Sequence, residues 1–230
     1  MVRMTTRTSR TGRRADALSK ERIVAAAIEI LDADGESALT FRALAARLAT
    51  GSGAIYWHVA NKGELLAAAC DDVVARAMAP AGRSTRPSDA VRNAALGVFD
   101  AIDAHPWVGT QLIAEPWQPA VVDIFERLGA PLEELGVPAS GQFDAASALL
   151  SHLLGLAGQY AAGARLLPPD ADRSDFLRDV AERWASLDPE EHPFVHRMAA
   201  RLPRHDDRAQ FLAGIDLFLA GVAGAADPAA

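Results

Sequence analysis

Cysteine is almost absent from this chain, which holds a single one, Cys70, in 230 residues. One thiol excludes an internal disulfide and argues against a cysteine-based metal cluster. Cys70 stands among alanines in a helical pattern, so we expect a small buried residue rather than a reactive thiol.

Long apolar runs are also missing from the sequence. No stretch approaches the roughly 20 apolar residues that span a bilayer. The basic N-terminus is not followed by the apolar segment of a signal peptide. We therefore expect a cytoplasmic protein without a membrane partner.

Aromatic residues make up 6% of the chain, and segments that alternate Val, Ile or Thr with polar residues are missing. Without that alternation, strands have little support. Half of the residues are hydrophobic, and many of these are alanine, which favours helices. The fold class that we predict is all-α, with roughly 70% of the unfolded surface buried.

Positive charge is scarce overall and concentrated at the start of the chain. Residues 1–80 hold 11 Lys and Arg against 9 Asp and Glu, a net charge of +2, whereas the remainder holds 12 against 21, a net charge of −9. We predict a basic arm over residues 1–17. Such an arm is either solvated and disordered or laid along an anionic polymer, and the sequence leaves both open.

Four helices are predicted within residues 18–80. Ser19 and Thr40 are N-caps with flanking hydrophobic staples, and Asn61 with Glu64 has the spacing of a capping box. Two short helices joined by a tight turn indicate a helix-turn-helix, in which the second short helix reads the major groove of DNA. The four predicted helices are 19–35, 40–48, 52–59 and 61–78.

Helical spacing sorts the residues of the predicted helix 52–59. Ile55 and Val59 lie four apart and form one apolar row, which must face the core. Tyr56, Trp57 and His58 occupy the other rows, and they cannot all be buried on so short a helix. Part of this cluster is therefore displayed to a partner. The alternative for Trp57 is that it packs back onto a neighbouring helix.

A second, larger helical domain is predicted over residues 88–230, after a Pro- and Gly-bounded linker at 80–87. Its two most apolar helices, 143–167 and 206–226, are apolar almost all round and should be largely buried. The other helices expected there are 88–104, 108–113, 119–135, 175–186 and 193–202.

The stretch LTFRALAARLATGSGAIYWHVANKGELL, residues 39–66, resembles the DNA-binding signature of the TetR family of bacterial repressors. YWHV followed by NK is similar to the tetracycline repressor branch in particular. The resemblance implies that Arg42 contacts phosphate or a base edge and that Lys62 grips a phosphate. It also implies that Ser52, Gly53 and Ala54 face bases. Contacts with sugar-phosphate and thymine methyls would come from Tyr56, Trp57 and His58.

The turn before the predicted reading helix departs from the family pattern. The family usually has glycine, an apolar residue and a polar cap, whereas Ala49, Thr50 and Gly51 stand here. Which residue caps the following helix is therefore left open.

Beyond residue 88, HPWVGTQLIAEP, LEELGV, HPFVHRM and FLAGIDLFLAGVAG are similar to the ligand-binding domain of the same branch. The similarity implies a homodimer in which helices 143–167 and 206–226 pair across a twofold axis as a four-helix bundle. Small residues would let these helices approach closely. They are Gly155, Gly158, Gly214 and Gly221. The alternative is an ordinary core within one chain.

Tetracycline repressors bind a magnesium–drug complex, but their magnesium-binding histidine has no counterpart here, since the aligned region reads Gly109-Thr110-Gln111. We predict no metal and no cofactor. A largely apolar ligand pocket is still expected. Each candidate lining residue has a core-packing role as its alternative: Trp107, Gln111, Trp117, Phe125, His152 and Gln159.

These features together predict a ligand-responsive transcriptional regulator. We expect a repressor that is released from double-stranded operator DNA by a small, largely apolar effector. One alternative is an all-helical enzyme, but no nucleophile elbow, phosphate loop, metal-ligand motif or carboxylate pair supports it. The other alternative is a DNA-binding regulator without a ligand.

Overall fold

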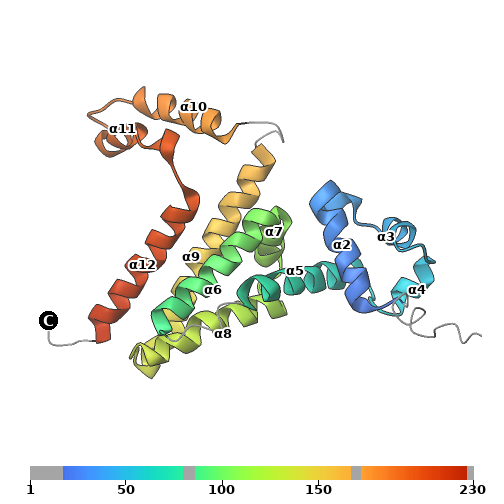
Figure 1. The fold of residues 1–230 in the computed structure, drawn as a ribbon. Coiled ribbons are helices and arrows are strands. Elements are labelled where there is room, and N and C mark those ends of the chain that lie inside the picture. Colours follow the sequence, from blue (N-terminus) through green and yellow to red (C-terminus); the bar gives the residue numbers. More distant parts are fainter. Residues whose placement is uncertain (1–17, 80–85, 167–171, 227–230) are drawn as a thin grey trace, which may run out of the picture. The chain divides into compact units, whose positions relative to one another are not determined.

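A computed structural model describes residues 18–79, 86–166 and 172–226 (Figure 1). The predicted basic arm, and most of the predicted linker, lie outside the described residues. Every element that the structure describes is a helix, which confirms the all-α prediction. None of these helices is long and apolar enough to cross a membrane.

The chain forms two compact units, Met1–Asp72 and Val73–Ala230. The division lies inside one helix, α5 (Lys62–Met78), so this helix contributes residues to both units. The first unit also contains α2 (Lys20–Asp34), the 3₁₀ turn η1 (Glu36–Ala38), α3 (Phe41–Arg47) and α4 (Ser52–Tyr56).

In the first unit α2 and α3 begin, and α2 ends, where the caps predict. The Ser19 side chain accepts a hydrogen bond from the Arg22 amide at 3.3 Å, and Thr40 accepts one from the Ala43 amide at 3.1 Å. Gly35 ends α2 with a φ of 76°, a left-handed conformation that glycine adopts without steric cost. The apolar stripes then meet in a fully buried core: Ile23, Ala27, Leu44, Ile55, Val59 and Leu65.

Cys70 is buried in α5, as predicted. Burial, with a smaller effect from the charge of Asp71, raises the pKa of its thiol to about 12. The thiol therefore stays protonated and unreactive at neutral pH in the folded chain.

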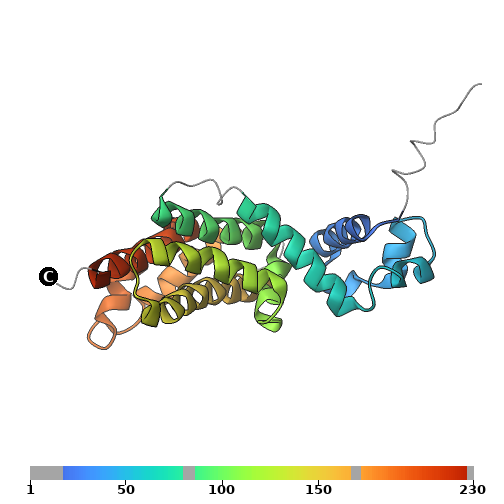
Figure 2. The same cartoon turned by 90° about the horizontal axis from the view of Figure 1, so that it is seen from below.

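The second unit is a helical layer with a smaller group of helices beside it. In both views α6, α8, α9 and α12 lie side by side (Figures 1 and 2). The layer comprises α6 (Pro87–Ala104), α7 (Pro106–Ala114), α8 (Pro119–Glu134), α9 (Ala139–Leu166) and α12 (Asp207–Ala226). The smaller group comprises α10 (Arg173–Ala185), α11 (Pro193–Ala199) and the 3₁₀ turn η3 (Leu202–Arg204).

Within this unit, α6 approaches the end of α5 at Gly97. A Cβ atom at position 97 would lie 2.7 Å from the Ala77 carbonyl oxygen and 3.3 Å from Met78 Cα. Both obstacles are backbone atoms, which cannot swing away as a flexible side chain can. Glycine is therefore required by the packing of α6 on this turn.

Gly97→Ala is expected to lower the free energy of unfolding by about 1–3 kcal/mol, because overpacking outweighs the better helix propensity of alanine. Urea unfolding followed by circular dichroism measures the change. Gly163→Ala on α9 is the matched control, since a Cβ there meets nothing within 4 Å, and it should cost no stability. A Gly97→Ala variant as stable as the wild type would contradict the close approach.

Candidate functional site

The turn between α3 and α4 is closed by backbone hydrogen bonds. Ala49 takes a φ of 49°, the left-handed region that side chains rarely adopt. The Thr50 amide then donates to the Ala45 carbonyl at 2.9 Å. Gly51 is the N-cap of α4 and makes no side-chain cap bond, which settles the question that the sequence leaves open.

Ala49→Gly is expected to raise the free energy of unfolding by about 0.5–1 kcal/mol. A left-handed non-glycine residue costs roughly 1–2 kcal/mol, and the greater freedom of glycine in the unfolded chain offsets part of the gain. Thermal unfolding measures the shift. Ala46→Gly, in the last turn of α3, should have the opposite sign because it places glycine at a helical position. Destabilisation by Ala49→Gly would show that position 49 carries no strain.

The short helix α4 buries one side and exposes the other. Ile55 is 0% exposed and Val59 is 1% exposed, which confirms the predicted apolar row. Trp57 is 89% exposed and Tyr56 is 54% exposed. Trp57 therefore does not pack back onto a neighbouring helix. The helix itself is shorter than predicted and ends at Tyr56, and in the turn that follows the amides of His58 and Val59 both donate to the Ile55 carbonyl.

Phe41, at the start of α3, supports the exposed tyrosine. Its ring stacks on Tyr56 with centroids 4.3 Å apart and planes 3° from parallel. Stacking at this distance holds the tyrosine ring in one orientation on the surface. Sequence reasoning missed Phe41; its signal was its place at the start of the helix that packs on α4.

The remaining predicted DNA contacts also lie on α3, α4 and the turn that follows, and α3 packs on α4. Arg42 and Gly53 are exposed, while Ser52, Ala54 and His58 are half-buried. We use the name "reading surface" for the predicted contacts on these two helices and on the turn after α4: Arg42, Ser52, Gly53, Ala54, Tyr56, Trp57 and His58.

Lys62 has a protein partner in this structure. Its Nζ donates to the Glu36 carbonyl oxygen at 2.6 Å and lies 3.6 Å from Glu36 Oε1. The ammonium thus fastens the start of α5 to η1. An ammonium group has three donors, so Lys62 can keep this bond and also donate to a phosphate. The phosphate contact itself stays a prediction.

The start of α5 is capped twice. Asn61 Oδ1 accepts from the Glu64 amide at 2.9 Å, and Glu64 Oε2 accepts from the Ala60 amide at 2.8 Å. The predicted capping pair is present, but Glu64 reaches Ala60 rather than Asn61. The Ala60 amide, and then Lys20 at 3.3 Å, hold the pKa of Glu64 below its usual range. These contacts fix the loop that carries Trp57 into α5.

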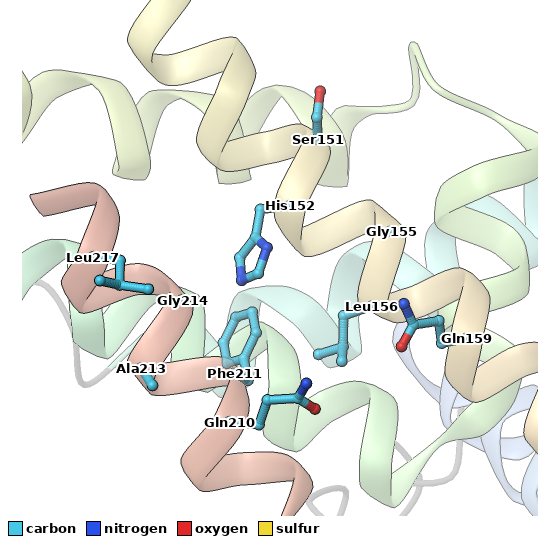
Figure 3. Close-up of a pocket in the computed structure, with 10 residues that line it drawn as sticks. All are labelled: Ser151, His152, Gly155, Leu156, Gln159, Gln210, Phe211, Ala213, Gly214 and Leu217. Atoms are coloured by element: carbon cyan, nitrogen blue, oxygen red, sulfur yellow. The ribbon is translucent and has the colours of Figure 1, made fainter. Parts of the chain in front are cut away.

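In the second unit, a hollow of about 460 Å³ lies between α9 and α12 (Figure 3). His152 reaches from α9 toward α12, and its ring stacks on Phe211 with centroids 5.5 Å apart. A Cβ at Gly214 would lie 2.6 Å from His152 Nε2, so this glycine makes room for the imidazole. Gln159 and Gln210 line the same hollow.

Of the six predicted pocket residues, the structure places His152 and Gln159 together at this hollow. His152 is exposed, so it is not the satisfied core histidine of the alternative interpretation. Trp117, in the turn between α7 and α8, is 90% exposed rather than interior. Trp107 and Phe125 are half-buried, beside His105 and Phe143 respectively.

The sixth residue, Gln111, is buried on α7 beside a second buried glutamine that the sequence did not single out. Gln118 Nε2 donates to the Gln111 carbonyl at 3.0 Å. Gln118 Oε1 is buried and accepts no hydrogen bond from any residue that the structure describes. Only the three-dimensional path of the α7–α8 turn brings the Gln118 side chain to the Gln111 backbone carbonyl.

One side of α12 has no partner among the described residues. Phe211, Ile215 and Leu219 are buried against the chain's own helices, whereas Leu217 is 76% exposed. An ion pair of 2.6 Å between Arg92 of α6 and Asp216 fixes this rotation of α12. Leu217 lines both the hollow of Figure 3 and a second one of about 460 Å³ farther along α12.

Two short helices joined by a tight turn, with an exposed aromatic pair at the end of the second, define a helix-turn-helix DNA-binding protein. The model for "bacterial regulatory proteins, tetR family" matches residues 23–69, which covers α3, α4 and most of α2.

Similarity to a solved structure extends over almost the whole chain, beyond the residues that the family model matches. A TetR regulator from Streptomyces coelicolor, SCO7222, is 49% identical and has a TM-score of 0.83, with 92% of this chain and 100% of that one covered. This chain belongs to the TetR family, and it is a transcriptional regulator rather than an enzyme.

Two further relatives are similar to this chain at lower identity. The repressor DrrR1 of Streptomyces coeruleorubidus is 29% identical over 177 residues, 75% of this chain. The S. coelicolor ActR, in complex with actinorhodin, is 26% identical with a TM-score of 0.71, covering 91% of this chain and 99% of that one. The chain spans about three fifths of the length of DrrR1 and of a second curated relative, an HTH-type transcriptional regulator of Saccharopolyspora erythraea.

Proposed function

We propose that this protein is a homodimeric repressor that binds double-stranded operator DNA through the reading surface and Lys62. The exposure of Trp57, directly after the short helix that buries Ile55, is the observation that carries the proposal. Trp57 and its neighbour Tyr56, which is 54% exposed, together present adjacent aromatic rings to solvent, and contiguous exposed apolar surface marks interaction sites. An operator on the chromosome also implies that the protein acts in the cytoplasm.

The dimer would form through α9 and α12, the helices predicted to pair. The exposed Leu217 and the apolar hollow that it lines farther along α12 support this face. Gly155 and Gly221 support it too, because a Cβ at either meets nothing within 4 Å inside one chain. Paired reading helices would then address two half-sites about 34 Å apart.

Release from DNA would follow from binding of a small, largely apolar effector to the second unit. His152 and Gln159 are the predicted contacts at the hollow between α9 and α12, and Trp107, Gln111, Trp117 and Phe125 remain predictions on α7, α8 and the turn between them. α5 contributes to both units, so a displacement of its last turn would be passed along one continuous helix toward Lys62. Such coupling needs two sites and two states of the protein. ActR in complex with actinorhodin is a relative with a bound small molecule.

In vitro selection of duplex DNA from a random pool by the purified chain tests the repressor assignment. We expect enrichment of an inverted repeat, and affinity for it that falls steeply as salt rises because phosphate contacts release counterions. A metabolite panel screened by thermal shift, followed by DNA release, then tests the effector. Failure to enrich any sequence would contradict the assignment.

A further inference from the structure

A third hollow, of about 560 Å³, lies where α11, η3 and the start of α12 meet α10. It shares only Gln210 with the hollow between α9 and α12. Its volume lies within the roughly 300–1,000 Å³ of small-molecule sites.

The wall of this hollow is largely apolar. Trp184 of α10 and Phe194 and Met198 of α11 line it, and Phe194 is 64% exposed. Two aromatic rings and a thioether suit a planar aromatic group, which stacks on ring faces and meets little polar surface there.

The rim of the hollow is positive. Arg201 and Arg204 both line it, both are exposed, and neither has an ion-pair partner among the residues that the structure describes. A third guanidinium, that of Arg197, lies 6.0 Å from the centre of the Phe194 ring. Planar guanidinium groups bind carboxylates in a two-pronged geometry that a lysine cannot reproduce.

The other charged groups of the hollow are already engaged. His205 Nε2 lies 3.1 Å from Asp207 Oδ1, and Asp207 also pairs with Arg173. Asp206 Oδ1 accepts from the Ala209 amide at 2.9 Å, at the positive N-terminal end of α12. Asp206 is the one carboxylate among the lining residues, so the two unpaired guanidinium groups outnumber it and leave the hollow with a net positive charge.

We propose that this hollow is a binding site for a small aromatic carboxylate, with the ring against Trp184 and Phe194 and the carboxylate between Arg201 and Arg204. A neutral aromatic compound would stack on the same rings but would lack the charge-assisted hydrogen bonds to the arginines. A protonated aromatic amine would be repelled by the two guanidinium groups. The site is independent of DNA binding and of the effector site between α9 and α12.

Calorimetric titration of the full chain with 2-naphthoate tests the site, with 2-naphthalenemethanol as the neutral comparator. We expect the naphthoate to bind at least tenfold more tightly than the alcohol. The double variant Arg201→Gln, Arg204→Gln should lose at least tenfold in naphthoate affinity. Arg183→Gln, an exposed arginine of α10 outside the hollow, should leave it unchanged.

Fluorescence quenching locates the bound ring. Quenching by naphthoate should disappear in Trp184→Phe while calorimetric binding persists, and circular dichroism checks that each variant is folded. Three results would overturn the site: no binding of naphthoate to the wild type, equal affinity for the alcohol, or wild-type affinity in the double arginine variant. None of these depends on whether the chain binds an operator.

Discussion

Replacing Trp57 and Lys62 together with alanine is expected to weaken operator binding by about a hundredfold or more. Each side chain is assigned a sugar-phosphate contact, and the loss of about 1.4 kcal/mol per contact is a factor of ten in affinity. Removal of the lysine charge should also reduce the salt dependence of binding by about one phosphate contact per subunit.

Fluorescence anisotropy on the selected operator duplex measures both effects. Trp117→Ala is a matched control, because Trp117 is 90% exposed, as Trp57 is 89% exposed, but lies in the other unit. It should bind operator as the wild type does. Wild-type affinity in the Trp57→Ala, Lys62→Ala variant would remove these residues from the DNA interface.

Lys62 needs a separate control because it also holds Glu36. Glu36→Ala removes the carboxylate but keeps the ammonium and its bond to the backbone carbonyl. If Lys62 acts on DNA through its charge, Glu36→Ala should bind operator at least as tightly as the wild type. Weaker binding in Glu36→Ala would instead assign Lys62 a purely structural role.

Leu217→Glu is expected to raise the dissociation constant of the dimer by at least about a hundredfold. A twofold interface contains every substituted position twice, and an unpaired carboxylate buried there costs several kcal/mol. Operator affinity should fall with it, because two linked reading helices bind far better than one.

Sedimentation velocity over a range of protein concentrations measures the association. Val122→Glu, on α8, places the same charge at a residue that is 58% exposed and lies outside the proposed dimer face. It should remain dimeric. A Leu217→Glu protein that sediments as a dimer at every concentration would place the interface elsewhere.

The sequence predicted the helix starts and the buried side of α4 because these depend on local chemistry. Ser19 and Thr40 each bond an amide three residues ahead, whatever lies farther away. Ile55 and Val59 follow from helical spacing in the same way. Roles at the DNA interface rest on the family resemblance and remain predictions.

Features that depend on several segments could not be predicted. Gln118 meets Gln111 only through the path of the α7–α8 turn, and Trp117 beside it turns outward. The rings of His152 and Phe211 come from helices far apart in the sequence. Helical periodicity indicates which residues share a face, but not which neighbouring helix that face will meet.

Substitution of the glycines distinguishes packing within one chain from packing between two subunits. Gly97 is demanded by the chain's own backbone, so its replacement should be harmful at every protein concentration. Gly155 and Gly221 have open space around them in one chain, so alanine there should be tolerated, or even favourable, in an isolated subunit. If alanine is never recovered at positions 155 and 221 among variants selected for repression, the cause would be contact with a second subunit.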